Sequence, residues 1–152
     1  MGNILGKLLV GVAITAVGML GADNSLGIWK RNVTKTTART QNTKSETVVR
    51  EEVEGGVKQT TTRERADGTK SIFSYTAKYD GKEHTVTNAP FDTISIKQID
   101  ANTFIETRKT GGVLHATGRV AISKDGKTMT VTTEGFDPQG KSDIGTYVYD
   151  KQ

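Results

Sequence analysis

Apolar and polar residues alternate along most of this chain. In the segment "SIFSYTAKY" (71–79), Phe73, Tyr75, Ala77 and Tyr79 fall on one face, and the residues between them are mostly polar. A period of two is typical of a half-buried β-strand, whose successive side chains point to opposite faces. The segments "DTISIKQI" and "TMTVTT" repeat the pattern, and nothing after residue 45 shows the helical period of about 3.6 residues. The sequence therefore predicts an all-β protein.

Turn residues interrupt the alternation at regular intervals. Asp67-Gly68, Asp80-Gly81 and Asp125-Gly126 are examples. Asp-Gly favours a tight two-residue hairpin, in which both residues adopt φ above zero, so consecutive strands should be antiparallel neighbours. The polar segment 34–45 lacks periodicity and is predicted to be a surface loop. The expected strands lie near residues 27–33, 46–54, 57–66, 70–79, 83–88, 92–99, 103–110, 113–123, 128–136 and 143–151.

So many short antiparallel strands must protect their edges from pairing with other chains. Closure into an up-and-down barrel removes the edges, and a two-sheet sandwich would also fit the pattern. We expect the barrel, with about 8–10 strands. A barrel of this size can be filled by its own side chains or can enclose one small ligand.

The first 22 residues differ in character from the rest. Lys7 precedes an apolar run from Leu8 to Leu20, which is the length of a signal-peptide core and shorter than the roughly 20 residues of a membrane span. We expect a secretory signal over 1–22, one domain over 23–152, and a secreted or periplasmic protein with no stable membrane span after signal removal. Because Met19 and Leu20 are larger than a cleavage site prefers, an uncleaved anchor helix is the alternative.

Composition narrows the possible chemistry. The chain has no cysteine, which excludes disulfides and thiol nucleophiles. Its 21 basic and 17 acidic residues are interspersed, so nucleic acid is not an expected partner. The carboxylates have no obvious acid–base pairing, and no metal-ligand spacing or phosphate loop is present. We therefore expect no enzyme, no metal and no cofactor, with an uncharacterised hydrolase or a haem-dependent activity as the alternative.

Both ends of the domain resemble intracellular lipid-binding proteins. "GIWK" (27–30) is similar to their Gly-Thr-Trp-Lys opening, and "TYVYDKQ" (146–152) is similar to their last strand. The internal segments "AKYDGKEHTVT", "KQIDANTF" and "SKDGKTMTVTTEG" resemble a family of small secreted bacterial proteins that open with Gly-Thr-Trp-Lys-Leu-Asn and whose function is poorly established. The resemblance implies a lipocalin-like (calycin) barrel.

The resemblance also implies a structural role for the only tryptophan. In such barrels Gly27 would let the chain turn in closely, and Trp29 would close one end of the barrel. The alternative is that Trp29 is an ordinary core residue. The sequence differs from the lipid-binding proteins at Tyr147, because those proteins have at this position the arginine that binds a fatty-acid carboxylate. The tyrosine that follows in their pattern is present here as Tyr149. A tyrosine hydroxyl can form one neutral hydrogen bond with a carboxylate, whereas an arginine guanidinium can form two charged ones.

The favoured function is binding of a small hydrophobic or amphipathic molecule, or a lipid, in the barrel. The alternative is a structural or interaction module with a filled interior that acts on a protein or a cell surface. The candidate ligand-binding residues are Phe73, Tyr75, Arg119, Tyr147 and Tyr149.

The segment "VLHATGRV" (113–120) leaves the role of Arg119 open. Its apolar residues alternate with His115, Thr117 and Arg119, so burial should turn these three outward. The other possibility is a polar interior in which they form a head-group or haem site. His84 follows a turn and should be exposed.

Overall fold

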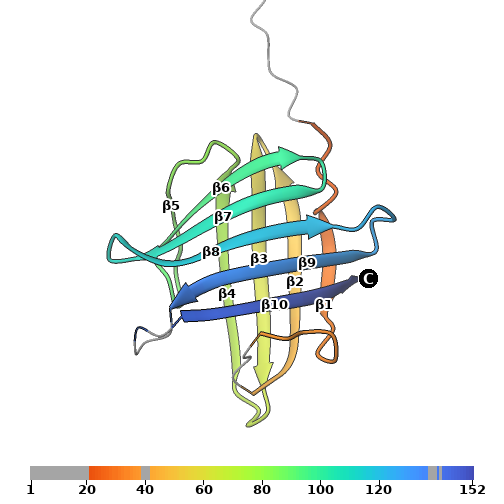
Figure 1. The fold of residues 1–152 in the computed structure, drawn as a ribbon, viewed down its shortest axis with the longest axis vertical. Coiled ribbons are helices and arrows are strands. Elements are labelled where there is room, and N and C mark those ends of the chain that lie inside the picture. The colour runs from red at the N-terminus through yellow and green to blue at the C-terminus, as the bar shows by residue number, and fades with distance from the viewer. Residues whose placement is uncertain (1–20, 39–41, 137–139, 141) are drawn as a thin grey trace, which may run out of the picture.

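The computed structural model describes residues 21–38, 42–136, 140 and 142–152, and it is all-β over that range (Figure 1). The predicted signal segment lies almost wholly outside the described residues, so the structure leaves that prediction untested. The ten strands are β1 (Gly27–Arg31), β2 (Thr43–Val53), β3 (Gly56–Arg65), β4 (Lys70–Lys78), β5 (His84–Thr85), β6 (Thr93–Asp100), β7 (Thr103–Thr110), β8 (Val113–Ile122), β9 (Thr128–Phe136) and β10 (Ser142–Lys151).

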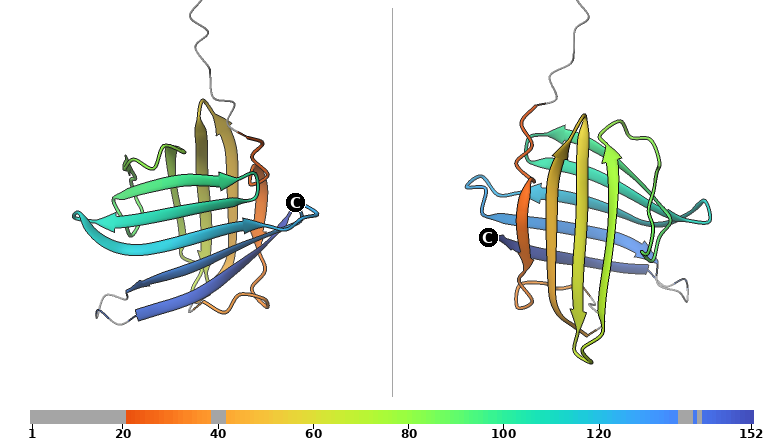
Figure 2. Two further views of the ribbon diagram at one scale, coloured as in Figure 1. Left: turned by 45° about the horizontal axis from the view of Figure 1, so that its top comes forward. Right: turned by 180° about the vertical axis from the view of Figure 1, so that it is seen from behind.

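The strands form one antiparallel sheet that curls into a nearly closed barrel. Their order is β4-β3-β2-β1-β10-β9-β8-β7-β6-β5, so every strand pairs with the next one in the chain except β4 with β5, and β1 pairs with β10. Between β4 and β5 a single bridge, Ser74–Thr87, replaces a ladder of hydrogen bonds. Strands β2–β4 run steeply across β6–β10, and Figure 2 shows the two groups facing each other around the interior. The barrel prediction is confirmed, and the two-sheet sandwich is wrong.

Two predicted elements differ from the structure. Strand β5 has two residues rather than the predicted 83–88, because its pairing with β6 ends at Thr85; Thr87 then bridges to Ser74 of β4, and Asn88 beyond it adopts a positive φ of 60°. Strand β2 begins at Thr43, inside the predicted loop 34–45. Thr43 pairs with Arg65 across a bulge, which continues the β2–β3 hairpin further than the polar sequence suggests.

The Asp-Gly turns also differ from the expected geometry. Gly68, Gly81 and Gly126 have positive φ values of 71–84°, whereas no aspartate among the described residues does. Each aspartate instead accepts a hydrogen bond at Oδ1 from the backbone N–H two residues on, as Asp67 does from Thr69 and Asp125 from Lys127. These are Asx-turns, in which the hydrogen bond to the aspartate carboxylate stabilises the turn. The aspartate itself does not need the positive φ that the two-residue hairpin would require.

Trp29 is completely buried near the start of β1. Its indole Nε1 donates to the backbone oxygen of Ser25 at 2.8 Å, and Gly27 between them has a φ of 122° that favours glycine. Residues 21–26 cross this end of the barrel, since Asn24 N–H donates to Ala101 O and Gln98 Nε2 donates to Ala22 O. This end is therefore covered by the chain itself.

Candidate functional site

A cavity of about 390 Å³ lies inside the barrel, on the side away from Trp29. Side chains from strands on both sides of the barrel line it, and we call it the barrel cavity. Its principal lining residues are Arg31, Glu46, Val48, Arg50, Gln59, Thr61, Arg63, Arg65, Phe73, Tyr75, Phe91, Glu106, Arg108, His115, Val120, Met129, Val131, Thr133, Tyr147 and Tyr149.

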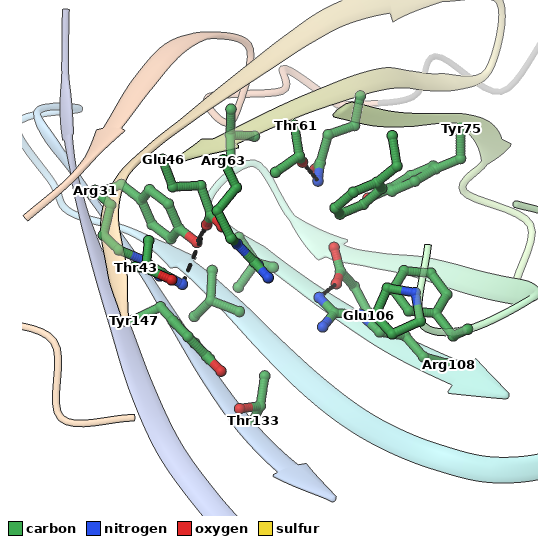
Figure 3. Close-up of a pocket in the computed structure, with 18 of the residues that line it drawn as sticks. Arg31, Thr43, Glu46, Thr61, Arg63, Tyr75, Glu106, Arg108, Thr133 and Tyr147 are labelled. Atoms are coloured by element: carbon green, nitrogen blue, oxygen red, sulfur yellow. Dashed lines mark hydrogen bonds and ion pairs between the residues drawn. The ribbon is translucent and has the colours of Figure 1, made fainter. Parts of the chain in front are cut away.

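The first group of charges in the cavity is the Glu46 cluster, formed by Glu46, Arg31, Arg63 and Tyr149 (Figure 3). Glu46 is 2% exposed, on the inner face of β2. Its Oε1 accepts from Tyr149 OH at 2.6 Å and lies 3.2 Å from Arg31 NH2, and its Oε2 accepts from Arg63 Nε at 2.5 Å. The ring of Tyr147 packs on the guanidinium of Arg31, 4.6 Å from Cζ to the ring centroid.

The second group is the Glu106 cluster, formed by Glu106, Arg50, Arg108 and Tyr75. Glu106 is 2% exposed on β7, where Oε2 accepts from Arg108 NH2 at 2.7 Å and Oε1 lies 3.8 Å from Arg50 NH1. Arg50 also donates to Ser25 Oγ at 3.0 Å and to Gln59 Oε1 at 2.7 Å. The clustering follows from strand alternation, because Glu106 and Arg108 are two residues apart on β7 and share its inner face.

Hydrogen-bond donors in both clusters lack acceptors. Among the described residues, Arg31 Nε and NH1, Arg50 NH2, Arg108 Nε and Tyr75 OH are buried and find none. Buried donors of this kind are costly unless something else satisfies them. Each cluster therefore has more hydrogen-bonding capacity than its own glutamate uses.

The cavity is also positively charged. Five arginines and two glutamates line it, which leaves a formal excess of three positive charges. Burial is the largest single effect on Arg108 and lowers its pKa, but the charge of Glu106, the neighbouring tyrosines and the hydrogen bond to Glu106 together raise that pKa above its ordinary value. Arg108 is consequently charged at neutral pH.

Two tyrosines of the cavity, Tyr149 and Tyr75, stay neutral. Burial, assisted by the negative charge of Glu46, raises the pKa of Tyr149 well above its ordinary value. Burial and the charge of Glu106 raise the pKa of Tyr75 in the same way. Tyr149 thus keeps its proton and donates a hydrogen bond to Glu46, and Tyr75 presents a protonated hydroxyl.

The structure brings together four of the five residues predicted to bind a ligand. Phe73, Tyr75, Tyr147 and Tyr149 all line the barrel cavity. Arg119 lies on the exposed face of β8 and does not line it. Whether the four residues bind a ligand stays a prediction.

The two histidines lie at different places. His115 lines the cavity and packs against Phe91, with ring centroids 6.4 Å apart. It has neither Thr117 nor Arg119 beside it in the cavity wall, so the predicted trio is not assembled. His84 lies 3.1 Å from Asp80 Oδ1 near the surface.

The sequence analysis missed the arginines and glutamates of the interior. The inner face of β2 presents Glu46, Val48 and Arg50 in alternation, so charged residues occupy positions where burial favours apolar ones. The sequence does contain one indication of this pairing, because Glu46 is opposite Arg63 in the hairpin formed by the predicted strands 46–54 and 57–66. Cross-strand pairs of opposite charge are usually solvated, however, and the sequence alone does not turn this pair inward.

The described part of the chain contains no cluster of three or more His, Asp or Glu side chains arranged to hold a metal ion. No helix in that part has the length and apolarity needed to cross a membrane. Comparisons with known protein families, with curated proteins and with solved structures find no match to this chain. The likeness to small secreted bacterial proteins therefore stays a prediction from the sequence.

Proposed function

We propose that this protein binds a small amphipathic molecule with an acidic head group inside its barrel. The observation that supports this most is the barrel cavity, whose five arginines exceed its two glutamates. Its volume of about 390 Å³ lies in the range of small-molecule sites, roughly 300–1,000 Å³. A structural barrel whose interior is filled by its own side chains would not contain a cavity of this size.

The chemistry of the lining supports an amphipathic ligand. Arg31, Arg63 and Arg108 supply charge and hydrogen-bond donors for a carboxylate, a phosphate or a sulfate. Val131 and Phe73 supply apolar surface for the rest of the molecule. The resemblance of both chain ends to intracellular lipid-binding proteins, and the lipocalin-like barrel that it implies, supports the same conclusion.

Native mass spectrometry of the protein purified from its own type of host tests the proposal. We expect a discrete adduct that organic solvent removes and that rebinds to the stripped protein. The matched variants are Thr133→Trp, which places an indole in the cavity, and Thr132→Trp, which places it on the exposed face of β9. The first should prevent rebinding and the second should not. A clean mass with no uptake from a mixed extract of lipids and hydrophobic metabolites would refute the proposal.

We also propose that the protein acts outside the cytoplasm. The support is the basic and apolar pattern of residues 1–22. Cell fractionation combined with the intact mass of the purified chain tests it: the mature protein is expected to begin near Asp23. A full-length chain recovered from the cytoplasm would contradict the proposal.

A further inference from the structure

The two charged clusters in the cavity have the same composition. Each contains one glutamate and two arginines; a buried tyrosine hydroxyl donates to the glutamate in the Glu46 cluster, whereas the hydroxyl of Tyr75 beside the Glu106 cluster has no hydrogen-bond partner among the described residues. In each, one arginine charge is balanced by the glutamate and one is left over. The Glu46 cluster leaves two donors of Arg31 without an acceptor, and the Glu106 cluster leaves single donors of Arg50, Arg108 and Tyr75.

The clusters lie far apart across the cavity. Glu46 and Arg50 are on the same face of β2 and four residues apart, which places their backbones about 13 Å from each other. Figure 3 shows Glu46 with Arg31 and Arg63 on one side of the view, and Glu106 with Arg108 on the other. The two glutamates are therefore held at separate places in the cavity, each with its own pair of arginines.

Apolar and uncharged side chains separate the clusters. Val48 lies between Glu46 and Arg50 on the inner face of β2, and Thr61, Val120 and Val131 also line the cavity. The two clusters are therefore separated by mainly uncharged side chains, and Arg65, the fifth arginine of the cavity, belongs to neither of them. A ligand with a single acidic group would satisfy one cluster and bring its apolar end against the other, where a buried charge would be left without a partner.

We propose that the ligand carries two acidic groups at opposite ends of an apolar middle, one for each cluster. This inference rests on the proposed function and adds the class of ligand: a dianion such as an α,ω-dicarboxylate, or a molecule with equally spaced acidic groups. Each acidic group supplies the negative charge that its cluster lacks. The guanidinium groups bind such groups by charge-assisted hydrogen bonds.

Isothermal titration calorimetry with chemically matched probes tests the inference. The probes are the straight-chain dicarboxylates from hexanedioate to tetradecanedioate, the monocarboxylate of each length, and the uncharged diol of each length. We expect an optimum at intermediate length, at which the dicarboxylate binds at least about tenfold more tightly than its monocarboxylate. We expect the diol to bind most weakly.

Two variants locate the two ends of the ligand. Arg31→Gln leaves Glu46 paired with Arg63, and Arg108→Gln leaves Glu106 beside Arg50. Neither variant therefore leaves a buried carboxylate without an arginine partner. Each should lower the affinity for the best dicarboxylate to about that of the monocarboxylate. Arg119→Gln, on the exposed face of β8, is the matched control and should change nothing. If Arg31→Gln does not fold, Arg63→Gln removes a charge from the same cluster at a more exposed position.

The outcomes separate this inference from the proposed function. Two results would overturn the inference of a ligand with two acidic groups: equal affinity for monocarboxylate and dicarboxylate at every length, or loss of affinity in only one of the two cluster variants. Either result would still agree with an amphipathic ligand that has a single acidic group. Absence of binding by every probe, together with a clean native mass, would overturn both.

Discussion

Replacing Glu46 with glutamine should destabilise the protein strongly, because this one carboxylate is the ion-pair partner of two arginines. Glu46→Gln keeps the shape of the side chain and an acceptor for Tyr149, but it removes the charge and replaces the oxygen that accepts from Arg63 with an amide NH2, which is a donor. Arg63 is 30% exposed and can turn to water, whereas the Arg31 side chain is 2% exposed and cannot. Breaking a buried ion pair by removing one partner costs about 3–5 kcal/mol, so we expect a loss in that range.

Urea unfolding followed by the fluorescence of Trp29, the only tryptophan, measures the loss. The midpoint should fall while the slope with denaturant stays constant. Glu64→Gln is the matched control, because its partner Lys44 is 65% exposed and exposed pairs contribute little. The double variant Arg31→Gln with Glu46→Gln should recover part of the loss, since it removes the unpaired charge. Equal midpoints for Glu46→Gln and Glu64→Gln would refute the argument.

Three further changes follow from the same interior. Trp29→Ala should cost about 3–5 kcal/mol in urea unfolding followed by circular dichroism, as large aromatic truncations do, and a loss well under about 1 kcal/mol would show that Trp29 does not hold the covered end together. From the sequence alone, Tyr149→Phe is expected to weaken a bound head group and leave the fold stable. The hydrogen bond from its hydroxyl to Glu46 changes that expectation to a loss of about 1.5–3 kcal/mol, and an unchanged urea midpoint would remove the bond from the network. Burial raises the pKa of Tyr75, Tyr79 and Tyr149, so the native state keeps protons that the unfolded chain releases above about pH 10. The free energy of unfolding should therefore be independent of these groups below pH 10 and fall above it, by about 1.4 kcal/mol per pH unit for each tyrosine that stays protonated. Phenolate absorbance should show fewer ionised tyrosines in the native protein than in the unfolded protein at the same pH, and identical titration curves would contradict this.

The fold could be predicted from the sequence because its signals are local. Alternation of period two identifies strands such as 70–79, and Asp-Gly pairs mark turns such as 67–68. The exceptions were also local: β5 ends at Thr85, and Asn88 just beyond it adopts a positive φ that the alternation pattern does not indicate. The pairing of β1 with β10 follows from closure, which edge protection favours.

The charged interior could not be predicted in the same way. Burial of apolar residues is the rule that assigns each strand a face, and it groups Tyr75 with Ala77 on one face of the strand predicted near 70–79, where both are buried. The same rule turns Glu46 and Arg50 outward. Arg31, Glu46 and Arg63 lie on the neighbouring strands β1, β2 and β3, and closure of the sheet into a barrel turns their shared face into an interior. Closure also brings Arg50 of β2 to Glu106 of β7.

The excess of arginine is a poor arrangement for stability, since apolar side chains of similar volume often stabilise an interior better than ion pairs. A ligand that supplies negative charge would therefore stabilise the protein as well as bind to it. By mass action, a dicarboxylate at 100 times its Kd should add about 2.7 kcal/mol to the free energy of unfolding. The gain at one fixed ligand concentration should be larger in Glu46→Gln, because that variant leaves two arginine charges for the ligand to balance. Urea unfolding with and without the best dicarboxylate measures both gains, and a smaller gain in the variant would show that the ligand does not contact the Glu46 cluster.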